Sequence, residues 1–387
     1  MNQRDDPSER RRLEELRAVV SRFEERVRAA QLRSPPTRDL VKGAVGPGGS
    51  ARCPAWLRRV TLDLIVRHGE ALVDLFEEFP DHLGRVAPYD FMIGYHPPGE
   101  ESIDPVAAFL ADSSWVDEWG VRWRHSKDGV GATEVENPLR DWKDLDDYLA
   151  RRFPDPRAPG RFDAARGPAA AFRKAGTYSF GLLGCVFYSL FSIRGFENAL
   201  MDFHENPEPL KRLVAALESF GLEMVRSWSE VGVDAVMILD DWGTQRSMLV
   251  SPAIWREFFK SGYAALISEA HARGMAAFLH SCGHVTEIIE DLIEVGLDVI
   301  DPVQTTAMEI DELARRFGGR ISFCGTIDVQ RLLPYGSPGE IKDAVRRSRK
   351  TLGTPFKDRL ILAPTNVITP EVPLENLRAM FEACHEG

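Results

Sequence analysis

The sequence is poor in cysteine and has no surplus of basic residues. Its five cysteines are scattered, and this odd number shows no framework spacing, which excludes a disulfide scaffold and favours a reducing compartment. The 59 acidic residues outnumber the 48 basic ones and leave a formal net charge of −11. Nucleic-acid binding is therefore not expected, because it requires a positively charged face.

A secretory signal core and a membrane-spanning helix are also missing. The first residues, MNQRDDPSERRR, are charged and polar, unlike the apolar core of a signal peptide. The stretch GTYSFGLLGCVFYSLFSI at 176–193 carries no charge and approaches the length that a bilayer requires. Its three glycines and three serines fit a strand, a turn and the start of a buried helix better. We therefore expect a cytoplasmic protein that does not enter the membrane.

The first sixty residues predict a helical extension before the main domain. Residues 8–32 carry apolar side chains three to four positions apart, which is typical of an amphipathic helix. The SPP sequence that follows should end this helix, and a second helix is predicted near residues 56–78. We assign 1–60 to the extension and 61–387 to one large domain, whose length suits a single barrel with insertions.

The region between this extension and residue 176 is rich in proline, glycine and charge. VAPYDFMIGY at 86–95 predicts the first substantial strand. Residues 119–138, with a central Asp-Gly pair, predict a hairpin insertion.

From residue 176 onward, short apolar runs alternate with segments of helical spacing. The apolar runs lie at 177–184, 233–241, 275–282, 297–304, 321–328 and 360–366. The helical segments lie at 252–273, 285–295, 309–317, 338–352 and 374–385. Continuously apolar strands that alternate with helices predict a parallel sheet covered on both faces. Their number favours an α/β fold of the (β/α)₈ TIM-barrel type over an open sheet.

Polar residues lie at or just beyond the ends of the five predicted strands from residue 233 onward. They are Asp240, Asp241, His280, Cys282, Asp301, Gln304, Cys324, Asp328, Gln330, Thr365 and Asn366. In a barrel the active site lies at the carboxyl ends of the strands, so we expect these side chains to surround one mouth.

His280 and Cys282, in FLHSCGHV at 278–285, bring an imidazole and a thiol to one strand end, and Cys324 ends a neighbouring strand. One histidine and two thiolates form a three-ligand zinc site with an open fourth position, the arrangement of catalytic zinc centres. Zinc would hold a bound thiol as a thiolate at neutral pH, and the thiolate could attack an alkyl group. The alternative is that both residues are buried strand residues without a ligand.

Other candidate residues would act on the substrate. Asp90, Asp240 and Asp241 are candidate proton donors or acceptors, and helix capping is the alternative for the Asp240–Asp241 pair. Arg194 could bind a carboxylate or pair with Glu197. The candidate substrate-binding residues are Tyr95, His96, Tyr178, Arg194, Gln245, Gln304 and Asn366. For the aromatic residues the alternative is a place in the core, and for the glutamines a place in loop structure.

Several stretches of the chain resemble the uroporphyrinogen decarboxylase superfamily, which includes zinc-dependent corrinoid:thiol methyltransferases. The principal stretches are GVDAVMILDDWG, SPAIWREFF, FLHSCGHVTEIIEDLIEVGLDVIDPVQ, GGRISFCGTIDVQRLLPYGSPGEI and ILAPTNVITPEVPLENLRAMFEA. Two earlier stretches, DEWGVRWR and FSIRGFENALMDFHENPEPLKRL, resemble the same superfamily. The resemblance implies a (β/α)₈ barrel.

Two branches of that superfamily differ in chemistry. The decarboxylases resemble one another through an RQAGRY-type arginine motif and an FSD-like motif, and neither occurs in this chain. The resemblance to the methyltransferases implies that His280 and Cys282 are the first two zinc ligands. Their third ligand, a cysteine, would fall near Thr365 or Asn366, so Cys324 or an Asp240–Asp241 oxygen would have to take its place.

Three hypotheses follow. The first is a methyltransferase-like enzyme that demethylates a small molecule and depends on zinc or a corrinoid. Its methyl donor would be a methyl-corrinoid on a partner protein, or a methoxylated or methylamine-like small molecule. The second is a metal-free decarboxylase or lyase that acts on a carboxylated tetrapyrrole or aromatic substrate. The third is a corrinoid- or porphyrin-binding protein without catalysis. The oligomeric state is left open, with a homodimer among the alternatives.

Overall fold

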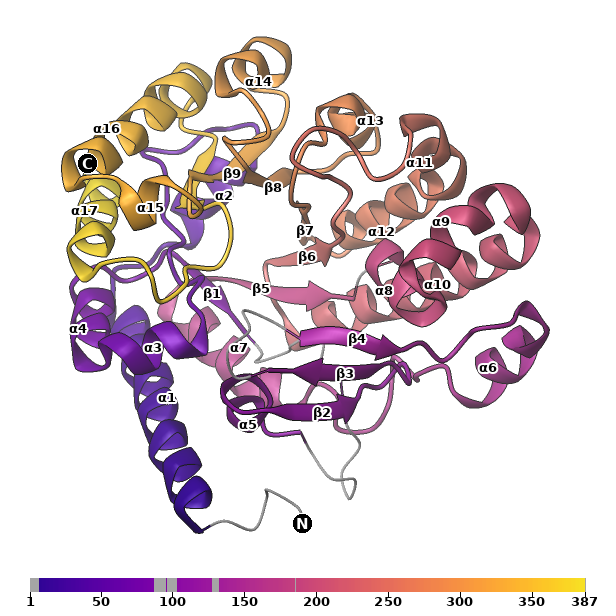
Figure 1. The fold of residues 1–387 in the computed structure, drawn as a ribbon. Helices are drawn as coiled ribbons and strands as arrows, with labels where there is room; N and C mark the ends of the chain where they lie inside the picture. Colours follow the sequence, from indigo (N-terminus) through magenta and orange to yellow (C-terminus); the bar gives the residue numbers. More distant parts are fainter. Residues whose placement is uncertain (1–6, 87–94, 96–102, 127–131, 185, 387) are drawn as a thin grey trace.

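A computed structural model describes residues 7–86, 95, 103–126, 132–184 and 186–386. Seven parallel strands form a curled sheet in the order β1-β5-β6-β7-β8-β9-β10 (Figure 1). Their bounds are β1 Leu83–Arg85, β5 Tyr178–Leu183, β6 Ala235–Leu239, β7 Ala276–His280, β8 Val299–Val303, β9 Ser322–Ile327 and β10 Leu360–Pro364. The predicted α/β barrel class is confirmed by this sheet and its helical cover.

Helices precede the sheet and connect its strands. Before the sheet lie α1 Pro7–Arg33, α2 Arg38–Val45, α3 Leu62–His68 and α4 Glu70–Glu78. The connecting helices are α5 Pro105–Leu110, α6 Leu145–Arg151, α7 Asp163–Ala175, α8 Val186–Arg194, α9 Phe196–Glu205, α10 Pro207–Val231, α11 Pro252–Phe258, α12 Lys260–Ala272, α13 Ile289–Glu294, α14 Ile310–Phe317, α15 Leu332–Tyr335 and α16 Pro338–Ser348, and α17 Leu374–His385 follows β10. Ser251 and Ser337 cap α11 and α16, as serine followed by proline favours at a helix start.

The extended segment 54–60 joins the two edges of the curled sheet. Ala55 forms a parallel bridge with Leu362 of β10, and its carbonyl accepts the N–H of His82, which precedes β1. Asp81 accepts the N–H groups of Leu57 and of the residue after it. The helix predicted near 56–78 therefore begins only at Leu62 and is divided by Gly69 into α3 and α4.

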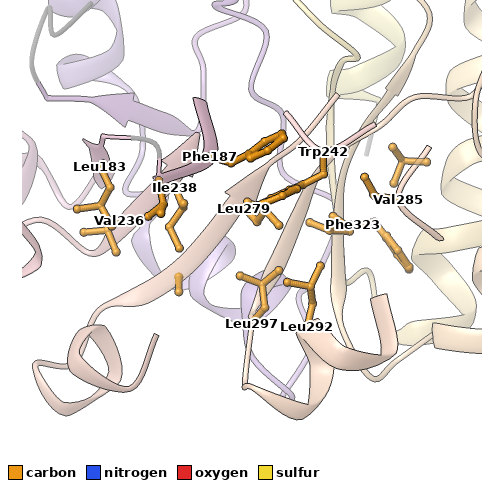
Figure 2. Packing of buried hydrophobic residues seen from close by; sticks show 14 of the residues in the cluster. Leu183, Phe187, Val236, Ile238, Trp242, Leu279, Val285, Leu292, Leu297 and Phe323 are labelled. Atoms are coloured by element: carbon orange, nitrogen blue, oxygen red, sulfur yellow. The ribbon is translucent and has the colours of Figure 1, made fainter. Parts of the chain in front are cut away.

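Side chains alternate between two cores along each strand. Phe278 of β7 packs inside the barrel with residues of the neighbouring strands, whereas Leu279 packs outward against the helices. Figure 2 shows part of the outer core, including Leu279 and, from α13, Leu292. Because successive side chains point to opposite faces of a strand, His280 shares the inner face with Phe278.

The predicted hairpin insertion is present as part of a three-stranded antiparallel sheet. It consists of β2 Ser113–Val116, β3 Arg122–His125 and β4 Ala132–Glu136. The Asp-Gly turn and most of the strand predicted at 86–95 lie outside the described residues. The uncharged stretch 176–193 contains β5 and most of α8, and no helix of the described residues has the length and apolar character needed to cross a bilayer.

Candidate metal centre

Three side chains with metal-binding atoms meet at the carboxyl ends of β6 and β7. In the described part of the chain, Asp241, His280 and Cys282 form the one group whose ligand atoms all lie within 4.8 Å of one another. His280 Nε2 lies 3.6 Å from Cys282 Sγ and 4.0 Å from an Asp241 carboxylate oxygen. The group therefore offers one nitrogen, one sulfur and one oxygen to a common point.

The backbone of two adjacent loops holds this group together. Cys282 N–H donates to Asp241 Oδ1 at 2.8 Å, and the Cys282 carbonyl accepts the N–H of Gly243. A Cβ atom on Gly243 would lie 2.5 Å from the backbone nitrogen of His284. Gly283 has φ +81°, a conformation that favours glycine. The two glycines thus permit the close contact that sets Asp241 beside Cys282.

A buried carboxylate orients the ring of His280. Asp301 Oδ2 lies 2.7 Å from His280 Nδ1, and Asp301 Oδ1 accepts a hydrogen bond from Arg59, whose guanidinium stacks 3.9 Å over the Trp56 ring. Burial opposes ionisation of Asp301, but Arg59 and His280 hold the pKa of this carboxyl well below its usual range. Nδ1 of His280 is thereby engaged, and Nε2 is left to face Cys282 and Asp241.

Electrostatics at His280 favour a positive charge when no metal is bound. Burial alone would lower the pKa of His280, but the neighbouring Cys282 and Asp301 outweigh it and raise this pKa well above its ordinary value. Asn366, which follows β10 closely, donates from its side-chain amide to Cys282 Sγ at 3.1 Å. The Cys282 sulfur is thus contacted by a ring nitrogen of His280 and by the amide of Asn366.

Cys324, predicted as a third ligand, lies elsewhere in the barrel interior. It is fully buried in the inner core, and its sulfur lies 3.7 Å from a guanidinium nitrogen of Arg59. Burial raises the pKa of this thiol well above its ordinary value. The structure therefore groups Asp241, and not Cys324, with His280 and Cys282.

Asp240 makes contacts different from those of Asp241. Its carboxylate accepts the N–H groups of Val186, Phe187 and Tyr188 at the start of α8, at 3.2, 2.9 and 3.0 Å. It also accepts the hydroxyl of Tyr263 from α12 at 2.7 Å, and burial raises the pKa of Asp240 to about 7. These contacts correspond to the helix-capping alternative.

The candidate substrate-binding residues are dispersed. Gln304 supports the metal loop, because its side-chain oxygen accepts the N–H of Gly283 at 2.7 Å, whereas Gln245 is exposed at the barrel rim. Tyr178 is buried in the inner core at the amino end of β5, and Arg194 is buried against Asp202.

Three further candidates come from the early part of the chain. Tyr95 donates its hydroxyl to the Pro159 carbonyl. Asp90 and His96 lie outside the described residues. Of the candidates for substrate binding, the structure thus brings Asn366 and Gln304 to the metal group.

The sequence does not predict a role for Arg59. This residue lies in a segment that is predicted to start a helix, and no local sequence pattern indicates its contact with Asp301. Asp301 itself could be found as a polar residue at the end of a predicted strand, but not as the partner of His280.

The sequence is similar to a known protein family and to individual members of it. The family model for uroporphyrinogen decarboxylase (URO-D) matches residues 119–387. A uroporphyrinogen decarboxylase of Pseudomonas fluorescens is 26% identical over 195 residues, which cover 50% of this chain and 53% of that protein. A methylated-thiol–coenzyme M methyltransferase of Methanosarcina mazei is 25% identical over 194 residues, 50% of this chain and 49% of that protein. The chain thus spans about half the length of the curated relatives that it matches.

A solved structure extends the similarity to nearly the whole chain. A methyltransferase from Methanosarcina mazei superposes with a TM-score of 0.65, covering 91% of this chain and 98% of that protein at 16% identity. At this identity the match supports the fold alone, and it agrees with the predicted α/β barrel.

Proposed function

The chain belongs to the uroporphyrinogen decarboxylase family, and on this premise we propose that it is a zinc-dependent, methyltransferase-like enzyme. Asp241, His280 and Cys282 would hold the ion at the carboxyl ends of β6 and β7. The substrate would be a small molecule, with a methyl group carried either by that molecule or by a corrinoid on a partner protein. The name of the methyltransferase relative, which refers to a methylated thiol, supports a sulfur-centred reaction.

The donor set carries the proposal. A thiolate, an imidazole nitrogen and a carboxylate oxygen are the three ligand types that zinc takes in proteins, and three protein ligands leave one position for substrate. Asp301 adds a second observation, because metal-binding histidines commonly donate their other ring N–H to a carboxylate. When bound, zinc would act as a Lewis acid that lowers the pKa of a substrate thiol.

The remaining residues would organise this site. Asp301 orients the His280 ring, and Arg59 offsets the negative charge of Asp301 inside the barrel. Asn366 would hold the Cys282 sulfur in position through the hydrogen bond from its side-chain amide. Gln304 holds the backbone of the metal loop through Gly283.

Metal analysis tests the proposal. Purified wild-type protein should contain about one zinc ion per chain, and zinc should fall close to zero in Cys282→Ser and Asp241→Ala variants. Cys324→Ser serves as the matched cysteine control and should retain zinc. Absence of zinc from wild type, or full zinc content in Cys282→Ser, would contradict the proposal. Loss of zinc from Cys324→Ser would show that the third ligand is the sulfur and not Asp241.

Metal-free decarboxylation is the second candidate, favoured by the sequence match to the decarboxylase of Pseudomonas fluorescens. It requires a proton donor near the substrate. Asp240 has four hydrogen-bond donors on its carboxylate from α8 and α12, which suits a cap better than a proton donor. Release of carbon dioxide that persists in the presence of a zinc chelator would support this second candidate.

A further inference from the structure

A depression lies at the carboxyl-end rim of the barrel, where the loops after β6, β8 and β9 meet. Six residues line it, and we call them the arginine rim: Gln245, Arg246, Thr305, Thr306, Gln330 and Arg331. The depression has a volume of about 610 Å³, which falls in the range of small-molecule sites. Its position on the loops of the catalytic face makes it a candidate for substrate contact.

The arginine rim contains cationic and amide groups and no carboxylate. Arg246 and Arg331 form no ion pair with any residue that the structure describes. The nearby carboxylate of Asp328 is occupied by backbone N–H groups, including those of Gln330 and Arg331. Among the residues that the structure describes, no carboxylate therefore neutralises the positive charge of these two guanidinium groups.

The amide groups of the rim are arranged to donate as well. The hydroxyl of Thr306 lies 3.3 Å from the side-chain oxygen of Gln245 and 3.5 Å from that of Gln330. Both amide oxygens face this hydroxyl, and within the described part of the chain neither NH₂ group donates a hydrogen bond, so both are open to another acceptor. The rim therefore combines two guanidinium groups with two amide donors, a set that suits an oxyanion.

The rim is connected to the candidate metal centre through short stretches of chain. Gln245 lies four residues after Asp241, and the carbonyl of Thr244 between them accepts the N–H of His284 at 2.7 Å. Thr305 follows Gln304, whose side chain holds the metal loop. A small molecule that reaches from the depression to the barrel mouth would thus place its anionic end at the arginine rim and its reacting end at the candidate metal centre.

We infer that the arginine rim binds the oxyanion of the small substrate, a carboxylate or a phosphate-like group, while the opposite end of that molecule reaches Cys282 and its neighbours. The identity of the reacting end rests on the proposed function, but the anion site itself does not. A local positive rim also gives an anionic substrate a favourable approach to a chain whose net charge is −11.

Calorimetric titration of the full chain tests the anion site directly. Inorganic phosphate and acetate are titrated separately at constant ionic strength, because screening would otherwise change with ligand concentration. Wild type should show saturable binding of at least one of them, and the Arg246→Gln/Arg331→Gln variant should bind it roughly tenfold more weakly or worse. The stronger ligand of the two identifies the class of oxyanion.

Two variants keep this result interpretable. Arg315→Gln removes an exposed arginine of α14 that, like the rim arginines, forms no ion pair within the described chain, and it should bind as wild type does. Cys282→Ser should also retain binding, so a failure of the zinc proposal does not affect this test. No saturable binding by wild type, or equal binding by wild type and the double variant, would overturn the inference.

A pair of thiols tests the connection to the metal centre. On zinc-loaded protein, 3-mercaptopropionate should bind roughly tenfold more tightly than 3-mercapto-1-propanol, and this preference should disappear in the double arginine variant. Equal affinities of the two thiols for wild type would overturn the link between the rim and the substrate. Absence of binding by both thiols, with phosphate binding intact, would overturn that link and locate the failure in the proposed function.

Discussion

Asp301 and His280 form a side-chain contact between two neighbouring strands at the barrel mouth, with 2.7 Å between Oδ2 of the carboxylate and Nδ1 of the ring. Asp301 has no exposed surface, and its charge is offset by Arg59, which comes from the N-terminal part of the chain. The pair therefore joins the buried residues 59 and 301 to the partly buried His280. Its consequence is that His280 presents Nε2, and not Nδ1, to Asp241 and Cys282.

Replacement of Asp301 by asparagine should weaken zinc binding. The amide cannot offset the charge of Arg59, and it accepts the ring N–H less strongly than a carboxylate does. Loss of such an outer partner typically costs 10–100-fold in metal affinity, and we expect a decrease of about that size. Competition with a chromophoric zinc chelator measures it.

A second histidine–aspartate pair supplies the matched control. His271 Nε2 also lies 2.7 Å from an aspartate oxygen, that of Asp298, but this pair lies outside the three-residue metal group. Asp298→Asn should leave zinc affinity unchanged. If Asp301→Asn binds zinc as tightly as wild type, Asp301 does not orient the ligand.

Asn366 should control the reactivity of Cys282. Its amide donates to the sulfur at 3.1 Å, and a hydrogen bond to a charged group contributes about 1.5–3 kcal/mol. In Asn366→Leu, alkylation of Cys282 by iodoacetamide near neutral pH should slow by roughly tenfold in the presence of a chelator. Mass spectrometry of the Cys282 peptide measures the rate. Asn198→Leu, a change of another partly buried asparagine, is the control, and an unchanged rate in Asn366→Leu would exclude the role of Asn366.

The later strands of the fold could be predicted from the sequence because they are continuously apolar. The run at 233–241 contains β6, and the run at 321–328 contains β9. The segment 54–60 could not be found in this way, since its partners Leu362 and Ile368 lie some three hundred residues away and leave no local signal. Its leucine and arginines are also good helix formers, which favoured the incorrect helix start near residue 56.

Prediction of the site was limited by side-chain direction. His280 and Cys282 were found from their spacing, and Asp241 was found as the end of a strand. The choice between Asp241 and Cys324 depends on how each side chain is directed around the barrel, which the sequence does not state. In the structure the Cys324 sulfur lies beside Arg59. Which residues bind zinc stays a prediction.

Gly243 should be required for the contact between the two metal loops. In Gly243→Ala the new Cβ would lie 2.6 Å from the Cys282 carbonyl oxygen and 2.5 Å from the His284 nitrogen, so the backbone must move. We expect a loss of about 1–3 kcal/mol in the free energy of unfolding, together with weaker zinc binding.

Gly339→Ala provides the comparison for this substitution. Gly339 lies in α16, and a Cβ there would meet only the Ser337 hydroxyl oxygen, at 4.0 Å, so the change should stabilise the protein by at most about 1 kcal/mol. Urea denaturation gives both values. Unaltered stability and zinc affinity in Gly243→Ala would show that the loops can separate without cost.

Asp240 should make the stability of the protein depend on pH. The pKa of Asp240 is raised to about 7 in the folded chain, from about 3.9 in an unfolded one. Between these values the unfolded state loses this proton first, so the free energy of unfolding should fall as pH rises, by at most about 1.4 kcal/mol per pH unit, and level off above about pH 7.

The difference in unfolding free energy between wild type and Asp240→Asn isolates this group, because the other carboxyls are common to both proteins. Tyr263→Phe removes a hydrogen-bond donor from the Asp240 carboxylate. This should raise the pKa of Asp240 further, so that the decrease in unfolding free energy continues to higher pH. A difference that stays constant from about pH 5 to about pH 8 would mean that Asp240 keeps the same charge in the folded and unfolded chain.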